Sequence, residues 1–189
     1  MQLSVIPNGI DLDKWQFRDR RKGFNVGFVG NIGSKKGIPL LLQIFFKLEL
    51  TDYRYRLHIA GQDEELRYLY YFNYMLDEFC LHSKVIKHGK INDMQEFYDD
   101  MSYILCTSPW ESQNVSAMEA MACGIKPVIH NFPGAKDIYL GRYLFNTIDE
   151  AVNKIVSPGY CAIEYREFVQ TRYSLKSQVK KMTEAIGVM

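Results

Sequence analysis

Short apolar segments alternate along this chain with segments that are long enough to form helices. The apolar runs end near glycines such as Gly30, Gly61 and Gly89, which is a signal of buried strands. Strands separated by helical segments pair in parallel, and the crossover helices cover both faces of the sheet. The sequence therefore predicts an α/β fold, a Rossmann-like parallel sheet flanked by helices. We expect strands at 25–29, 55–60, 84–87, 103–107, 126–129 and 143–145, and helices at 37–50, 63–81, 93–101 and 116–123.

The length and composition suit one such domain with an extension at each end. The chain has 189 residues, and 47% of them are hydrophobic, which is enough for a sizeable core. We expect a linker or domain start over 1–22, the sheet domain over 23–148, and C-terminal helices over 149–189. The first segment shows no helix cap of its own, which favours a linker that joins this domain to another one upstream.

The charge balance and the cysteine pattern argue against two classes of partner. Lysine and arginine together number 23 against 22 acidic residues, so the charge does not favour nucleic-acid binding. The four cysteines form no CxxC pair and no HExxH motif occurs, so we expect no metal site and no cofactor. Widely spaced cysteines favour a reducing compartment, and the longest apolar stretch, 38–50, is too short to span a bilayer. We therefore expect a cytoplasmic protein.

The loop GNIGSKKG follows the first expected strand and has the composition of a phosphate-binding turn. Its small residues let backbone amides approach an anion, and Lys35 and Lys36 add positive charge. The loop is not a P-loop, because GxxxxGK[ST] is absent. Taken alone, the loop favours a tight turn with exposed lysines over a phosphate site, because glycine-rich turns are common. The spacing of Gly27, Gly30 and Gly33 also leaves open a nicotinamide-dependent enzyme, although Gly27 lies inside the expected strand.

Two glutamates follow the fourth expected strand, within SPWESQNVSAMEAMACGIKPVI. Glu111 lies in the loop and Glu119 in the first turns of the next helix, so we expect both carboxylates to point into one cleft. A carboxylate accepts strong hydrogen bonds from a vicinal diol, which ribose and hexoses both carry. The pair therefore favours sugar recognition. Two other interpretations stay open, namely that Ser116 and Glu119 form a capping box and that Glu111 is an exposed loop acid.

Several segments, in this order, resemble one protein family. They are VIPNGIDLDKW near the start, VGNIGSKKGIPLLL, LHIAGQ and ESQNVSAMEAMACGIKPVI, and the late segment RYSLKSQVKKMTEAI resembles the family's closing helix. Together they resemble the C-terminal, nucleotide-sugar-binding domain of retaining GT-B glycosyltransferases, especially family 4, over about residues 4–139. The specific part is the combination of Glu-x7-Glu and AMACGxxPVI downstream of PNGID.

The resemblance implies a glycosyl-donor site with a role for each matching residue. Lys36 matches the lysine that neutralises the donor diphosphate, Glu119 the glutamate that binds ribose, and Glu111 the one that faces the transferred sugar. Lys36 and Glu111 are accordingly the expected catalytic residues. The implied reaction is retaining, metal-independent transfer of a hexose-like sugar from a UDP- or GDP-sugar to a glycan or lipid-linked acceptor, as in polysaccharide biosynthesis. The expected donor-binding residues are Gly30, Asn31, Gly33, Lys35, Lys36, His88, Gly89, Lys90, Ile91, Glu111, Ser112, Gln113, Asn114, Val115 and Glu119.

The resemblance also implies partners outside this chain. The family binds its acceptor with an N-terminal domain, so we expect this chain alone to bind a donor weakly and not to turn over. A membrane-associated acceptor would place the protein at the periphery of the membrane.

Two departures from the family pattern keep alternatives open. Asn31 stands where the family usually has an arginine, and the sequence SQN replaces a glycine-rich loop. These two departures leave three possibilities open: weak activity, an unusual donor, or Lys35 acting as the second cation for the phosphates. The rival functions are a non-catalytic nucleotide-sugar-binding module and a sugar epimerase of similar architecture.

Overall fold

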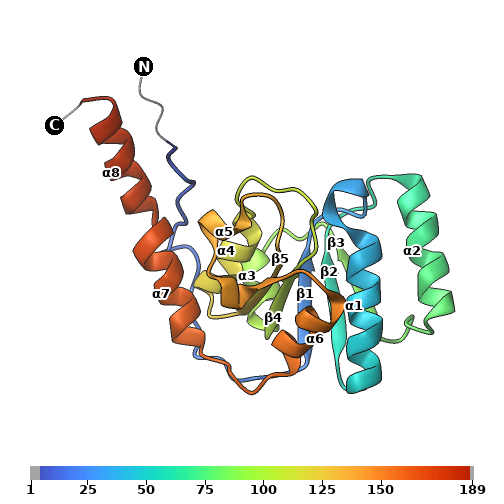
Figure 1. The fold of residues 1–189 in the computed structure, drawn as a ribbon. Coiled ribbons are helices and arrows are strands. Elements are labelled where there is room, and N and C mark those ends of the chain that lie inside the picture. The colour runs from blue at the N-terminus through green and yellow to red at the C-terminus, as the bar shows by residue number, and fades with distance from the viewer. Residues whose placement is uncertain (1–4, 188–189) are drawn as a thin grey trace.

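The computed structural model describes residues 5–187 and contains a parallel sheet of six strands with helices on both faces (Figure 1). The strand order is β3-β2-β1-β4-β5-β6. The strands are β1 (Asn25–Val29), β2 (Arg56–Ala60), β3 (Val85–Gly89), β4 (Tyr103–Cys106), β5 (Lys126–His130) and β6 (Leu144–Phe145). The predicted Rossmann-like parallel sheet is therefore confirmed. The outer ends of the expected terminal segments, 1–4 and 188–189, lie outside the described residues.

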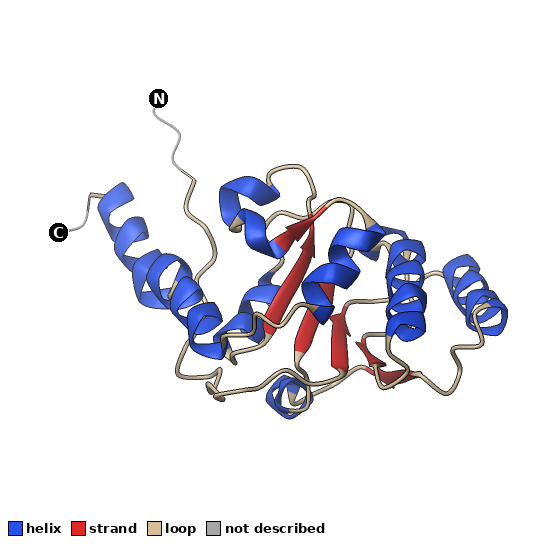
Figure 2. Ribbon diagram, turned by 60° about the horizontal axis from the view of Figure 1, so that its bottom comes forward, coloured by secondary structure: helices blue, strands red, loops and turns tan. Residues whose placement is uncertain are grey.

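Helices cover the sheet in two layers, and Figure 2 shows helices on either side of the strands. One layer holds α1 (Ile38–Thr51), α2 (Leu66–Glu78) and α6 (Ile148–Val156), and the other holds α3 (Met94–Asp99), α4 (Val115–Ala122), α5 (Ala135–Ile138) and α7 (Ala162–Tyr173). Two short 3-10 turns, η1 (Ser34–Lys36) and η2 (Gly141–Tyr143), and the last helix, α8 (Leu175–Ala185), complete the described chain.

Each strand contributes side chains to the core on both faces of the sheet, because side chains along a strand alternate between the faces. In β4, Tyr103 and Leu105 pack under the layer of α1, whereas Ile104 and Cys106 pack under the layer of α4. All four residues are buried, which is typical of a parallel sheet covered on both sides. This is why the strands appear in the sequence as continuous apolar runs rather than as alternating patterns.

The sheet has one topological switch point, between β1 and β4. These strands are neighbours in the sheet but are separated in sequence by β2 and β3. The chain therefore winds outward in one direction from β1 and in the other direction from β4. Ligands of such sheets bind at the carboxyl ends of the two strands that flank the switch point. The loops that follow β1 and β4 are consequently the first place to look for a site.

Two helix starts differ from the sequence prediction. The helix expected from residue 63 begins at Leu66, because Asp63 forms a parallel bridge with Ile32 and the amides of Glu64 and Glu65 donate to the Ile32 carbonyl. The three acids therefore precede the helix rather than form its first turn. Asn92 was the expected cap of α3, but the cap is Asp93. The Asp93 side chain accepts hydrogen bonds from the amides of Gln95 and Glu96.

The segment expected to be a linker or domain start is attached to the rest of the chain by hydrogen bonds from Asn8 onward. Ile10 is 2% exposed, and its backbone exchanges hydrogen bonds with the carbonyl of Tyr173 (2.7 Å) and the amide of Leu175 (2.9 Å). Trp15, 4% exposed, packs edge-on against Tyr98 of α3. The segment thus runs between α7 and α3, and the Arg166 guanidinium of α7 donates to the carbonyls of Leu12 and Trp15. The predicted breaks in the C-terminal helices, near 157–159 and 173–174, match the ends of α6 and α7.

Candidate functional site

Lys36 and Glu111 meet at the switch point. They lie 75 residues apart in sequence, yet Lys36 Nζ is 2.5 Å from Glu111 Oε1. Lys36 ends η1 in the loop after β1, and Glu111 lies in the loop after β4, so the two flanking strands each deliver one partner. Their side chains are 29% and 16% exposed, which keeps the pair accessible to a ligand. Both were candidates from the sequence, and the fold brings them together.

Glycines fix the path of Lys36. Its methylenes lie over Gly30, where a Cβ would come within 3.0 Å of Lys36 Cγ and Cδ. Gly37 has a φ of +65°, and a Cβ there would lie 2.0 Å from the carbonyl oxygen of Thr107. The Thr107 hydroxyl in turn donates to the Lys36 carbonyl at 2.8 Å. A larger side chain at Gly37 would separate the two loops, so this glycine is needed for the close approach of backbone to backbone, whereas a side chain at Gly30 would displace the methylenes of Lys36.

The remaining polar groups of the first loop are largely used within the protein. The Asn31 side-chain oxygen accepts from the Gln62 amide at 2.9 Å. The amide and hydroxyl of Ser34 both donate to Glu65 Oε1, at 2.7 and 2.6 Å. These hydrogen bonds from Ser34 hold the pKa of the Glu65 carboxyl below its usual range. The cations available to an anion in this loop are therefore Lys36, once released by Glu111, and the exposed Lys35.

Glu119 lies on α4 with its carboxylate free of the helix terminus. The cap of α4 is Asn114, whose side chain accepts from the Ala117 amide at 3.2 Å, so the alternative of a Ser116–Glu119 capping box is wrong. Asn114 has a φ of +56°, a conformation that asparagine adopts more readily than most residues. The Tyr98 hydroxyl lies 3.4 Å from Glu119 Oε2, and burial raises the pKa of this carboxyl.

Two adjoining pockets lie at the carboxyl edge of the sheet and share Met94 of α3. The larger, about 610 Å³, has Glu119 on one side and Lys14, Trp15 and Gln16 among its other walls. The smaller, about 240 Å³, is bounded by Asn31, Gly61, Gln62, Lys90 and Ile91 as well as Ala60 and Met94. The residues of the first loop and of the loop after β3 therefore face one space, as the sequence predicted for Asn31, Lys90 and Ile91. The walls at 14–16 were not among the predicted site residues, although the preceding PNGID motif marks that segment.

Several other predicted residues lie away from these pockets. His88 Nε2 is 3.1 Å from His58 Nδ1, and the His88 ring also packs edge-on against Phe97. Burial lowers the pKa of His58, with a further contribution from His88. Gly89, with a φ of +67°, turns the chain between His88 and Lys90. Gly33 lies against Glu65, since a Cβ there would be 3.0 Å from Glu65 Oε1.

The loop after β4 is anchored through Gln113, which is 6% exposed. Its side-chain amide donates to the Asn8 carbonyl at 2.8 Å and accepts from the Asn8 amide at 2.7 Å. The Tyr139 hydroxyl donates to the Gln113 carbonyl at 2.7 Å. The Gln113 side chain thus holds the start of the chain to the glutamate loop, a structural contact that the sequence alone does not reveal. Ser112 and Val115, on either side, are exposed.

Comparison with known proteins identifies the family. The profile of the family described as "Glycosyl transferases group 1" matches residues 10–141 of this chain, which is well over half of it. The chain belongs to this family. The glycosyl transferase group 1 chain is 24% identical over 144 residues to the GDP-mannose:cellobiosyl-diphosphopolyprenol alpha-mannosyltransferase of Xanthomonas campestris, covering 70% of this chain and 35% of that protein. It is also 24% identical over 168 residues to the capsular polysaccharide biosynthesis glycosyltransferase CapM of Staphylococcus aureus, covering 79% and 44% of the two proteins.

Solved structures of glycosyltransferases share the fold of this group 1 chain. HepE of Anabaena in complex with UDP superposes with a TM-score of 0.86 at 17% identity, over 98% of this chain and 57% of that one. The C-terminal domain of LpcC, a group 1 family protein of Francisella tularensis, superposes with a TM-score of 0.76 at 18% identity, over 88% of this chain and all of that one. The predicted GT-B glycosyltransferase domain is therefore confirmed. The chain spans less than half the length of the two relatives matched by sequence.

Two further properties of the described residues concern membranes and metals. Within residues 5–187, no helix is both long and apolar enough to cross a bilayer. Across the same residues, no three His, Cys, Asp or Glu side chains gather in an arrangement that could hold a metal ion.

Proposed function

We propose that this chain is the donor-binding, C-terminal half of a retaining glycosyltransferase that uses a nucleotide-sugar. The observation that carries the proposal is the Lys36–Glu111 pair, with Nζ and Oε1 2.5 Å apart, at the switch point of a group 1 glycosyl transferase domain. A cation and a carboxylate at this point suit a ligand that carries both a diphosphate and sugar hydroxyls. The superposition with LpcC covers all of that chain, which is itself described as a C-terminal domain. This supports the assignment of the present chain to the C-terminal half of a glycosyltransferase.

The donor would extend from Lys36 along the carboxyl edge of the sheet. In this proposal Lys36 binds the diphosphate and Glu111 orients the sugar. Glu119 binds the ribose from the larger pocket, and Lys90 and Ile91 border the nucleobase in the smaller one, which has Met94 as a wall in common with the larger pocket. Gly30, Asn31, Gly33 and Lys35 border the phosphates, while His88 and Gly89 shape the base loop and 112–115 form the loop beside the sugar.

The reaction proposed needs negative charge to be stabilised as the glycosidic bond breaks. The ammonium of Lys36, released from Glu111, would stabilise the departing diphosphate, and the amino end of α4 would add a smaller positive potential. A phosphate oxygen of the donor would accept the proton of the acceptor hydroxyl, so we propose no metal and no further cofactor. An N-terminal domain of the longer protein would bind the acceptor, and a membrane-linked acceptor would bring a cytoplasmic enzyme to the membrane surface.

The test is titration calorimetry of the chain with UDP and with GDP. We expect Lys36→Met to weaken binding by about tenfold or more, since a charge-assisted hydrogen bond contributes about 1.5–3 kcal/mol. Glu119→Gln is expected to weaken binding of the nucleotide and to leave binding of free diphosphate unchanged. Lys176→Met removes the same charge from the exposed surface of α8 and serves as the matched control. Equal affinity of Lys36→Met and Lys176→Met for both nucleotides would contradict the proposal.

A non-catalytic nucleotide-sugar-binding module is the second candidate, and one observation favours it. Asn31, at the position of the family's usual arginine, holds the Gln62 amide, and Glu65 holds the Ser34 amide, so two groups of the phosphate loop are committed to the protein itself. A transfer assay with a longer protein that includes this chain separates the two candidates. Product formation that Lys36→Met abolishes supports the enzyme, and donor binding without any product supports the module.

A further inference from the structure

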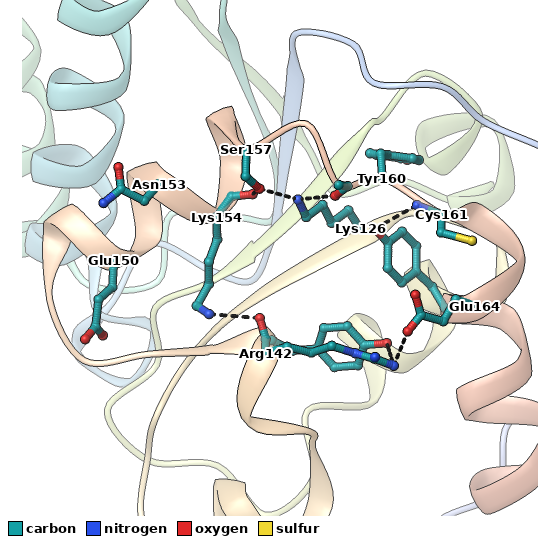
Figure 3. A pocket seen from close by; sticks show the side chains of 12 residues that line it. Lys126, Arg142, Glu150, Asn153, Lys154, Ser157, Tyr160, Cys161 and Glu164 are labelled. Atoms are coloured by element: carbon teal, nitrogen blue, oxygen red, sulfur yellow. Dashed lines mark hydrogen bonds and ion pairs between the residues drawn. The ribbon is translucent and has the colours of Figure 1, made fainter.

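A third pocket, of about 650 Å³, opens at the amino-terminal edge of the sheet (Figure 3). Lys126, which begins β5, lies in its wall, whereas the proposed donor site lies where strands end. Figure 3 shows Lys126 and Lys154 entering this pocket from two different elements, β5 and α6. The rings of Tyr160 and Tyr165 complete an apolar side. The volume is within the range of pockets for small molecules.

The ammonium of Lys126 has no acidic partner. The residue is 9% exposed, and its Nζ donates to the Gly159 carbonyl at 2.6 Å and to the Ser157 hydroxyl at 3.0 Å. An ammonium has three N–H groups, so one donor remains for a ligand. No carboxylate lies within ion-pair distance of this nitrogen in the described part of the chain.

The other charges of the pocket do not supply the missing anion. Lys154 Nζ donates to the Arg142 carbonyl at 2.8 Å and forms no ion pair with a described carboxylate. Glu164 is paired with the Arg142 guanidinium, and Glu150 accepts from the Asn146 amide at 2.6 Å within the capping box of α6. Both carboxylates of the pocket are therefore engaged, and the two ammonium groups donate hydrogen bonds only to neutral groups, with the Glu150 charge acting on Lys154 from one helical turn away.

The carboxyl end of α6 accounts for part of this positive charge but not for all of it. Lys22 donates to the Val156 carbonyl, the last of that helix, and Lys126 donates just beyond it. A helix terminus offers about half a negative charge, and three lysines gather around this one. Burial, followed by the charges of Lys22 and Lys154, lowers the pKa of Lys126 to about 8. The positive charge of the three lysines therefore exceeds the partial negative charge that the carboxyl end of α6 offers.

We propose that this pocket binds the phosphate group of a small soluble phosphate monoester, with Lys126 and Lys154 as its cations. The phosphate would take the unused donor of Lys126 and replace water around Lys154. The organic part would lie on the apolar side formed by Tyr160 and Tyr165. The site is separate from the proposed donor site, so its ligand would act as an effector or a second substrate and not as the sugar donor.

The test is a two-dimensional NMR titration of the chain with inorganic phosphate and with phenyl phosphate. We expect shifts confined to the loop 157–161 and to the surroundings of Lys126, with phenyl phosphate binding more tightly than inorganic phosphate because of the apolar side. Lys126→Met and Lys154→Gln should each weaken phenyl phosphate binding by about tenfold. Binding should also raise the pKa of Lys126, which its own side-chain carbon resonances report. Lys176→Gln is the control of equal charge, and it should bind as the unmodified chain does.

The outcomes separate clearly. Lys154 is only partly buried, so Lys154→Gln keeps the test valid if Lys126→Met does not fold. Equal binding by Lys154→Gln and Lys176→Gln would overturn the proposal, as would shifts that appear only around Lys36. Vesicles containing phosphatidate form the last arm, because a lipid headgroup carries the same phosphate chemistry. Binding to vesicles that Lys154→Gln abolishes, without any response to phenyl phosphate, would also overturn it, since the recessed Lys126 is proposed to select a soluble ligand.

Discussion

Glu111→Gln is expected to increase the affinity of the chain for free UDP or GDP. The Glu111 carboxylate holds Lys36 Nζ at 2.5 Å, and a diphosphate that binds Lys36 must first break this ion pair. Glutamine keeps the shape of the side chain and removes its charge. The same substitution is expected to weaken the contribution of the sugar to binding, because Glu111 is proposed to orient the sugar. The two ligands should therefore respond with opposite signs.

The magnitude follows from the exposure of the pair. The two side chains are 29% and 16% exposed, so the pair is neither a fully solvated surface contact nor a dry buried one. Partly exposed pairs contribute about 1 kcal/mol after desolvation and side-chain entropy are included. UDP or GDP does not need to break this ion pair when it binds to the Glu111→Gln variant, so its binding constant is expected to rise by about fivefold. Lys36→Met in the same chain should change affinity for UDP in the opposite direction.

Calorimetry with UDP, GDP and a matching nucleotide-sugar measures all three effects. Glu64→Gln is the control, because Glu64 is an exposed acid beside Gly33. This substitution removes the same charge near the loop at a residue that does not contact Lys36. If Glu111→Gln binds UDP within twofold of the unmodified chain, or more weakly, the carboxylate does not compete with phosphate for Lys36. If Glu64→Gln gives the same increase as Glu111→Gln, the cause is the general field of the loop and not the ion pair.

Three further predictions concern stability. Gln113→Ala should lower the free energy of unfolding in urea by about 1–3 kcal/mol, because the amide and carbonyl of Asn8 both lose a partner; an unchanged midpoint would contradict the anchoring role. Burial raises the pKa of Glu119, so its charge costs stability above the carboxyl range; Glu119→Gln should melt higher than the unmodified chain at pH 7 and lose that advantage as the pH falls below about 4. The pKa of Lys126 is about 8 in the fold and 10.5 as a free side chain, so the unfolded chain binds more protons between these values; the stability of the unmodified chain should rise through that window relative to Lys126→Met, and parallel pH curves would refute this.

The sequence was sufficient for the positions of the strands and their parallel direction but not for the helix starts. Parallel strands buried on both faces are continuous apolar runs, so β1, β2 and β4 could be located to within a residue or two. Helix caps could not, because neighbouring side chains such as Asn92 and Asp93 are both able to cap. The choice depends on local backbone geometry, which for α4 selects Asn114 in a left-handed conformation over Ser116.

The candidate site was predictable to the same degree. Lys36 and Glu111 could be expected together because the carboxyl ends of neighbouring parallel strands meet at one edge. His88 shows the limit of this reasoning, since the pairing of β2 with β3 places its ring on His58, away from the two pockets. The bonds between Gln113 and Asn8 show another limit. A side chain that holds backbone groups 105 residues away leaves no local pattern in the sequence.

The anchoring of the first segment has a consequence for the proposed two-domain enzyme. Asn8 is bonded to the loop that carries Glu111, and Lys14 and Trp15 form walls of the pocket that Glu119 lines. These residues belong to the segment that would join the sheet domain to an upstream domain. A rotation of that domain would therefore act on both glutamates through residues 8–15, without any contact between the upstream domain and the donor. In such an arrangement, acceptor binding on one side could adjust the donor site on the other, because the connecting segment is itself part of the site.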